Sequence, residues 1–175
     1  MSIARIIATL VLSLAIVPAR ADALQDGIAA MHRKDYAAAL RLLEPLALAG
    51  QPQAQLRLGQ LHYHGHGVPE SDARAVQWFE RAARQGLAEA QFQLGNMYAY
   101  GLADPGGGAD PHRLAAQWYF EAARQGHSDA QYSLGILFLS GTGVVQDAGE
   151  AARWIERAAA QGHADAAAYL RGKGS

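Results

Sequence analysis

The stretch AQLRLGQLHYHGHGV (residues 54–68) decides the fold, because it occurs in three versions along the chain. The other two are AQFQLGNMYAYGL (residues 90–102) and AQYSLGILFLSGTGV (residues 130–144). Each is followed by a second related block, which reads WFERAARQG (residues 78–86), WYFEAARQG (residues 118–126) and WIERAAAQG (residues 154–162). Self-similarity of this kind is the sequence signature of a repeat protein.

The distance between the two blocks gives the length of the repeat. Gly59 and Trp78 lie 19 positions apart, as do the matching residues of the third copy, whereas Gly95 and Trp118 lie 23 apart. The repeat is therefore 36 residues long, with four extra residues in the middle copy. We place the copies at residues 54–89, 90–129 and 130–165. The glycines and tryptophans that mark them are Gly59, Trp78, Gly86, Gly95, Trp118, Gly126, Gly135, Trp154 and Gly162.

Each copy contains two helical patterns. In the first block apolar residues recur at helical spacing, and Gly65 is placed to end that helix in the left-handed conformation. The second helix begins at an N-cap residue and ends at the closing glycine. The three N-cap residues are Ser71, Asp110 (followed by Pro111) and Asp147. We therefore predict an all-α fold, a right-handed α/α superhelical solenoid of helix–turn–helix repeats.

Small and large residues predict how these helices pack. Gly59 on the first helix and Ala82 or Ala83 on the second allow the paired helices to approach closely, because side chains at the contact set the distance between helices. The three tryptophans are large enough to fill the space between one pair and the next, and each would bury about 200 Å².

The two ends of the solenoid differ from its centre. Residues 22–53 form a degenerate unit with a shorter turn, and residues 166–175 begin a further first helix and stop. Terminal repeats are atypical because they cover an otherwise exposed apolar face, so we interpret both segments as caps. In the first cap the repeat positions are held by Gly27, Asp35, Ala39, Leu42 and Gly50.

Residues 1–21 are typical of a secretory signal peptide. Arg5 supplies a positive charge, residues 6–17 are an apolar run, and Ala19 and Ala21 provide small residues for cleavage. A permanent membrane anchor is the alternative, but a span needs about 20 apolar residues and this run is shorter. We expect cleavage after Ala21, and a periplasmic or secreted protein with no membrane span after cleavage.

Composition excludes several classes of function. The chain has a net charge of −1, and removal of Arg5 and Arg20 with the signal peptide makes it more acidic. No basic stripe is present, so we expect no nucleic-acid partner. The absence of cysteine excludes a disulfide framework, a thiol nucleophile and a lipid-anchored cysteine. No hydrolase, metalloprotease or phosphate-loop motif is present, so we predict no catalytic residue and no cofactor.

The repeated pattern of A-x-x-x-L-G with an aromatic residue, followed by W-x-x-x-A-A-x-Q-G, resembles the Sel-like repeat family, a longer-turn relative of the tetratricopeptide repeat. The resemblance covers residues 54–165, and the short turn of the first unit is closer to a plain tetratricopeptide repeat. It implies an α/α solenoid that binds other proteins. Some cysteine-rich members are described as penicillin-binding or β-lactamase-like, which implies an alternative function.

The histidines at 62, 64 and 66 raise the question of a metal site. In the aligned repeats His62 stands where Tyr98 and Phe138 stand, which is the aromatic core position of the first helix. Residues two apart on a helix point in nearly opposite directions, so His62 and His64 are not placed to share a metal. We predict no metal site, and metal binding stays as a testable alternative.

The face of the first helix that varies among repeats is the candidate binding surface. In related repeats these positions line the concave side, where aromatic and amide side chains suit a peptide or a partner helix. Leu56, Phe92 and Tyr132 have an alternative, which is packing between successive first helices. The candidate partner-binding residues are Leu56, Gln60, Tyr63, His64, Phe92, Asn96, Tyr100, Tyr132 and Ile136.

Two functions from different classes follow from these observations. The first is a monomeric, non-enzymatic, exported repeat protein that binds a protein or peptide. The second, by family analogy alone, is a periplasmic protein that binds or hydrolyses peptidoglycan fragments or β-lactams.

Overall fold

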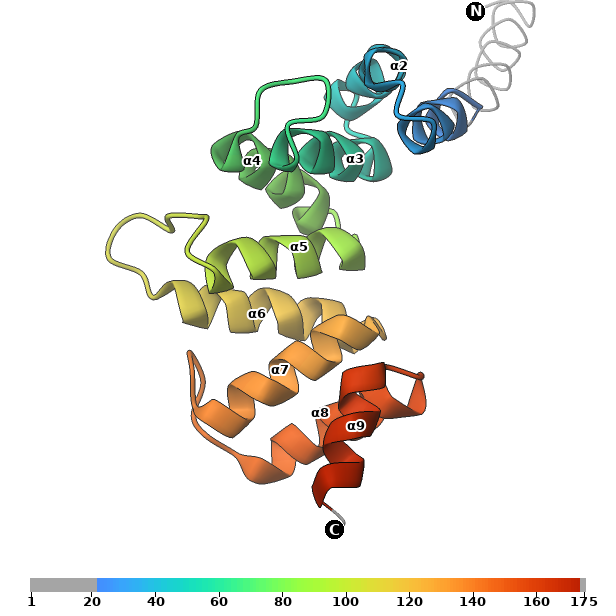
Figure 1. Ribbon diagram of the computed structural model, residues 1–175. Helices are drawn as coiled ribbons and strands as arrows, with labels where there is room; N and C mark the ends of the chain where they lie inside the picture. The colour runs from blue at the N-terminus through green and yellow to red at the C-terminus, as the bar shows by residue number, and fades with distance from the viewer. Residues whose placement is uncertain (1–21, 174–175) are drawn as a thin grey trace, which may run out of the picture.

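The computed structural model describes residues 22–173, and every regular element in that range is an α-helix (Figure 1). Residues 22–32 are helical, and eight labelled helices follow. They are α2 (Tyr36–Leu48), α3 (Pro52–Tyr63), α4 (Asp72–Arg84), α5 (Ala88–Ala99), α6 (Pro111–Arg124), α7 (Ser128–Ser140), α8 (Ala148–Ala160) and α9 (Ala164–Lys173). The predicted signal peptide lies outside the described residues.

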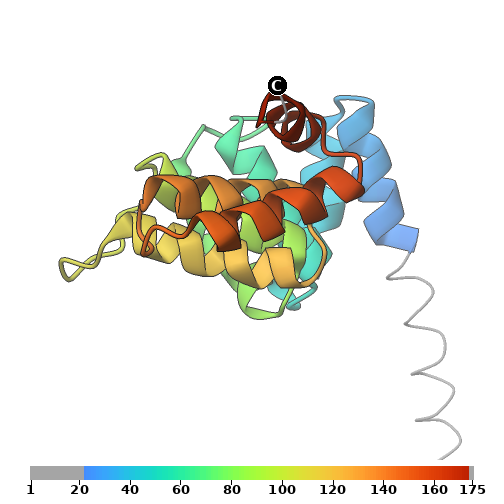
Figure 2. The same ribbon diagram turned by 90° about the horizontal axis from the view of Figure 1, so that it is seen from below.

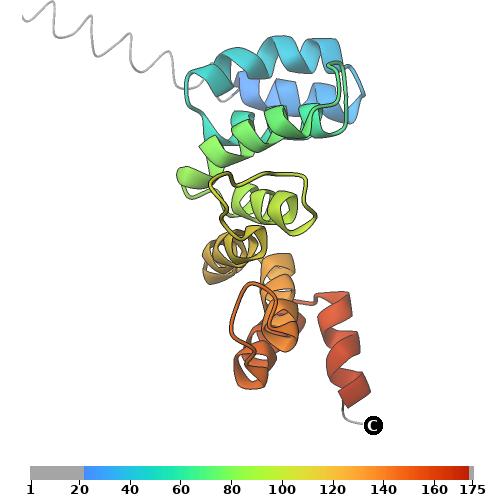
Figure 3. The ribbon, with the colours of Figure 1, turned by 90° about the vertical axis from the view of Figure 1, so that its left-hand side faces the viewer.

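Each helix packs chiefly against the next one along the chain, so the pairs stack into an elongated solenoid (Figure 1). The pairs are α3 with α4, α5 with α6, and α7 with α8. The long turns within these pairs lie along one edge of the stack, which Figure 3 views face on. The prediction of an all-α solenoid is confirmed.

The helix ends are where the sequence predicts them. Asp147 accepts hydrogen bonds from the backbone N–H of Gly149 and Glu150 and so caps α8, and Ser71 accepts one from Arg74 at the start of α4. Gly65, just after α3, has a φ of 64°. Glycine adopts this left-handed conformation at the end of a helix without the steric penalty of a Cβ atom.

The helix pairs close on a glycine of the first helix and a large side chain of the second. A Cβ placed on Gly59 would lie 2.4 Å from the Phe79 ring, and one on Gly95 would lie 2.6 Å from the Tyr119 ring. Gly135 meets Ile155 in the same way. The predicted close approach at these glycines is confirmed, but the predicted partner, Ala82 or Ala83, is wrong. The residue after each tryptophan fills the space at the glycine instead.

The tryptophans face the preceding repeat, as predicted, but only one is fully buried. Trp78 packs on the hydrophobic cluster that contains Leu43 and Leu46 of α2, and Trp118 packs on the cluster that contains Phe79 of α4. Both are half-buried, whereas Trp154 is 6% exposed. The expectation that each of the three buries a similar area is therefore wrong. Trp154 belongs to a buried hydrophobic cluster, whereas Trp78 and Trp118 are partly buried residues packed against one.

A glutamine pair links each repeat to the one before it. Gln91 on α5 donates to the carbonyl of Ala83 at the end of α4, and Gln125 after α6 donates to the Gln91 side chain. Gln55 with Gln85, and Gln131 with Gln161, repeat this arrangement. These bonds satisfy the carbonyls that a helix leaves unpaired at its C-terminus.

None of the helices within residues 22–173 has the length and hydrophobicity needed to cross a membrane.

Candidate partner-binding groove

A groove lies on the face formed by the first helices of the second and third repeats. Its volume is about 280 Å³. We call it the first-helix groove, and it is lined by Ala99, Tyr100, Tyr119, Tyr132, Ser133, Ile136 and Leu137. Three of the predicted contact residues, Tyr100, Tyr132 and Ile136, therefore come together in one cavity.

The tyrosines of this groove differ in how they are held. Tyr100, which follows α5, is 74% exposed. Tyr119 is buried, and its hydroxyl donates a 2.7 Å hydrogen bond to the side-chain oxygen of Asn96. Burial raises the pKa of Tyr119 far above its ordinary value, so its phenol stays protonated. Tyr100 is thus free to contact a ligand, whereas Tyr119 and Asn96 form the fixed wall beside it.

The Tyr132 ring stacks on a histidine, His163. The two ring centroids lie 4.6 Å apart, and His163 Nε2 lies 3.2 Å from Asp129 Oδ1. His163 Nδ1 accepts a hydrogen bond from the backbone N–H of Ala166, which caps α9. An acceptor at Nδ1 requires the ring proton on Nε2, the nitrogen that lies near the Asp129 carboxylate.

The same arrangement occurs one repeat earlier. Phe92 stacks on His127 at 4.7 Å, and His127 Nε2 lies 2.9 Å from Glu89 Oε2. The hydrogen bond from His127 lowers the pKa of Glu89 despite its partial burial, which favours the carboxylate as acceptor. In the first repeat Leu56 and Leu87 hold the positions of the aromatic ring and the histidine. Phe92 and Tyr132 are therefore supported side chains at a junction between repeats, and Tyr132 also lines the groove.

One candidate partner-binding residue, Leu56, is buried and does not lie on the surface. Leu56 is 1% exposed and belongs to the cluster around Phe79, so its predicted place on an open face is wrong and the packing alternative holds. The reason is that Leu56 packs in one buried cluster with residues of α4 and α5, among them Phe79 and Leu94, which leaves no opening at this position. Gln60 is half-buried and accepts a hydrogen bond from Arg57.

Tyr63 and His64 lie apart from the first-helix groove. They line a more polar depression of about 330 Å³ together with Glu70, Asp72 and Leu102. Tyr63 and Tyr100, which are both among the candidate partner-binding residues, therefore do not share a cavity.

The histidine stretch forms a ring cluster. His66 stacks on Tyr36 with 4.4 Å between centroids, and the rings of His64 and His66 lie 5.3 Å apart. His62 is buried, as its alignment with aromatic residues predicted, and its Nδ1 has no hydrogen-bond partner among the described residues. Within residues 22–173, no three His, Cys, Asp or Glu side chains are grouped so that they could hold a metal ion.

Stacked helix pairs with an open groove between first helices define an α/α solenoid repeat protein. The model of the Sel1 repeat matches residues 19–51, 52–87, 88–127 and 128–163, so the chain belongs to the Sel1 repeat family. All four units match, including the degenerate first one. The predicted family is confirmed.

Solved structures of repeat proteins are similar to this chain. A Sel1 repeat protein of Oxalobacter formigenes is 35% identical over 80% of the chain, with a TM-score of 0.72. A protective antigen of uropathogenic Escherichia coli with an SLR fold is 34% identical over 76% of the chain, with a TM-score of 0.70. The chain spans 56% and 28% of these two proteins' lengths.

Cysteine rich protein B of Helicobacter pylori has the same fold, with a TM-score of 0.54 at 20% identity, over 83% of this chain and 96% of that one. No curated protein sequence gives a significant match.

Proposed function

We propose that this chain is a non-enzymatic repeat protein that binds a segment of another protein in the first-helix groove. The observation that carries the proposal is the groove itself, in which the exposed Tyr100 faces a wall formed by Tyr119, Tyr132 and Ile136. Tyrosine gives a large, rigid contact surface and a hydroxyl at low entropic cost, and binding hot spots are enriched in it.

The rigid back of the groove supports the same proposal. Tyr119 is tied to Asn96, and Tyr132 is backed by His163, so two of the aromatic walls are already in place before a ligand arrives. Such preorganisation reduces the entropy lost on binding. Membership of the Sel1 repeat family, whose members are often interaction scaffolds, agrees with this role.

Binding measurements on matched variants test the proposal. Proteins captured from a periplasmic extract by the intact chain serve as probes, and each is then measured against the double variant Tyr100→Ala with Ile136→Ala. We expect the double variant to bind about 1–4 kcal/mol more weakly while its helical content is retained. Val145→Ala removes an exposed apolar side chain elsewhere on the surface and is the matched control. Equal loss in the control, or no loss in the double variant, would reject the groove.

We also propose that the protein is exported, on the basis of the charged, apolar and small-residue segments of residues 1–21. N-terminal sequencing of protein from the periplasm or medium should find a chain that starts at Asp22. Uncleaved protein confined to the cytoplasm would contradict this proposal. Turnover of nitrocefin by the purified chain would instead favour the enzymatic alternative.

A further inference from the structure

Two of the three Sel1 repeats that carry a tryptophan cover it with their own arginine. The guanidinium carbon of Arg81 lies 4.5 Å from the Trp78 ring centroid, and that of Arg157 lies 4.6 Å from Trp154. Both arginines come three residues after the tryptophan on the same helix. A guanidinium over the face of an indole is attracted by the negative face of the ring.

The middle repeat replaces this arginine with an acid. Glu121 stands where Arg81 and Arg157 stand, and Phe120 stands where the neighbours have Glu80 and Glu156. Within the described residues, Trp118 has no cation over its ring. The half-buried Trp118 therefore keeps an open surface, with a carboxylate at the position from which its neighbours supply the cation.

A groove of about 350 Å³ lies at this place on α6. We call it the second-helix groove, and it is lined by Leu114, Gln117, Trp118, Phe120 and Glu121. Phe120 is 41% exposed and meets Trp154 edge to face at 6.0 Å, which fixes its ring as a wall of the groove. An exposed phenylalanine at a position that is acidic in the other repeats is the signal in the sequence for this site.

Arg124 lies beside Phe120 but does not line the groove. The guanidinium carbon of Arg124 lies 5.7 Å from the Phe120 ring centroid, and Arg124 Nη1 lies 3.5 and 3.4 Å from the two Glu121 carboxylate oxygens. Both side chains of that ion pair are largely exposed, and such pairs contribute little. Each oxygen of the Glu121 carboxylate has two lone pairs, so the carboxylate can accept further hydrogen bonds while Arg124 stays beside it.

We propose that the second-helix groove binds an arginine side chain of a partner protein. The incoming guanidinium would take the place over Trp118 that Arg81 and Arg157 take over their own tryptophans. A planar guanidinium can stack on the indole and donate to a carboxylate at the same time, which the compact lysine ammonium does less well. The chain's net charge of −1 adds no repulsion to a cationic partner.

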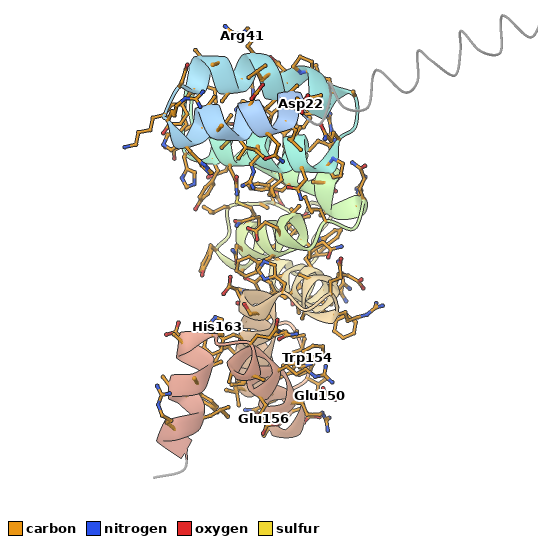
Figure 4. The ribbon with its side chains drawn as sticks, turned by 90° about the vertical axis from the view of Figure 1, so that its right-hand side faces the viewer. Asp22, Arg41, Glu150, Trp154, Glu156 and His163 are labelled. Atoms are coloured by element: carbon orange, nitrogen blue, oxygen red, sulfur yellow. The ribbon has the colours of Figure 1, made fainter. Side chains whose placement is uncertain are left out.

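This site is separate from the first-helix groove and does not depend on the proposed function. The first-helix groove is backed by His163 through Tyr132, whereas the second-helix groove adjoins Trp154 through Phe120. His163 and Trp154 lie on opposite sides of the C-terminal part of the stack (Figure 4). The chain would therefore hold one partner on each side.

Nuclear magnetic resonance of the three indole N–H groups in the full mature chain tests the proposal. The probe is a capped Gly-Arg-Gly peptide, and the matched control replaces arginine with citrulline, which has nearly the same shape and no charge. We expect the Trp118 signal to shift with saturation on addition of the arginine peptide. The citrulline peptide should bind about fivefold to tenfold more weakly. Equal binding of the two peptides, or no shift at Trp118, would overturn the proposal.

Exchange of residues between repeats gives a second test. E121R restores the neighbours' arginine, so it should cover Trp118 and reduce the probe's affinity about tenfold. The Glu121 side chain is 47% exposed, and an unchanged melting temperature of E121R would show that the fold is retained. R81E should uncover Trp78 and make its signal respond to the probe. Undiminished binding by E121R, or a silent Trp78 in folded R81E, would contradict the proposal.

Discussion

The middle Sel1 repeat and its two neighbours share one interior and differ at the surface. In all three a glycine of the first helix packs against a large side chain of the second. In all three, too, a pair of hydrogen-bonded glutamines includes one that donates to a backbone carbonyl of the preceding helix. Only the middle repeat has the uncovered Trp118, the exposed Phe120 and a longer turn between its helices. Because each repeat of a solenoid contacts only its neighbours, local changes of this kind leave the stack intact.

The largest expected difference between the middle repeat and its neighbour concerns their tryptophans. Trp154→Ala should cost about 3–5 kcal/mol, because a buried aromatic side chain is removed from a packed site. Trp118→Ala should cost about half as much, because one side of Trp118 is already open to the second-helix groove. Urea unfolding of both variants measures the two losses.

Two results of these unfolding measurements would contradict the expected difference between Trp118 and Trp154. Equal losses for the two variants would mean that Trp118 is covered in solution, and the proposed arginine site would lose its basis. A larger loss for Trp118→Ala would place the main packing contact in the middle repeat.

The sequence predicts the fold well because three copies of one pattern each give the same information. The N-caps, the C-terminal glycines and the helix pairs all follow from local residue types, and the structure has them at the expected positions. The alignment of the copies also places His62 in the core. These features depend on residues near each other in the chain, which a pattern can represent.

The candidate site was harder to predict because it depends on which side of a helix is left open. Leu56 and Tyr132 hold the same repeat position, yet one is in the core and the other lines a groove. Tyr63 and Tyr100 look equivalent by spacing, but they line different depressions. The missed residues Phe120 and Glu121 break the repeat pattern, and a comparison of the copies at each exposed position would have found them.

A smaller effect on stability is expected at His62, where the first repeat has a histidine in place of the aromatic residue of the other repeats. Burial, with a smaller effect from Arg74, lowers the pKa of His62 below its ordinary value, while the Pro69 carbonyl and Glu44 oppose the shift. The neutral ring is thus favoured in the fold. Its contribution to stability is present above the ordinary pKa of about 6.5 and is lost as the pH falls through the lower, folded-state pKa.

His62→Phe introduces the kind of aromatic side chain found in the other repeats and removes this pH dependence. We expect the variant to be more stable by about 1 kcal/mol at pH 7, because a buried nitrogen without a partner is removed. The difference in stability between the variant and the original chain should increase as the pH is lowered to 5. Thermal unfolding across this range measures it, with the exposed His64→Phe as the matched control. If this difference in stability decreased on acidification, the charged form of His62 would be stabilised in the folded protein.

The smallest effect on stability is expected when the longer turn of the middle repeat is shortened. This turn extends away from the stack between α5 and α6 (Figures 1 and 2). Gly106, Gly107 and Gly108 all have left-handed backbone angles and open space around them. Within residues 22–173 the Asp104 side chain accepts a hydrogen bond only from the nearby Gly106 N–H. The turn therefore makes few contacts that its removal would lose.

Deletion of residues 105–108 would give this turn the length found in the neighbouring repeats. The buried Ala103 is kept, so the helix pair should close as before, with a change in unfolding free energy within about 0.5 kcal/mol because loop length affects closure entropy only weakly. Partner binding by the first-helix groove should also be unchanged, since the deleted residues do not line it. If the deletion abolished binding while Tyr100→Ala with Ile136→Ala did not, the recognition surface would be the turn edge of the middle repeat and not its first-helix face.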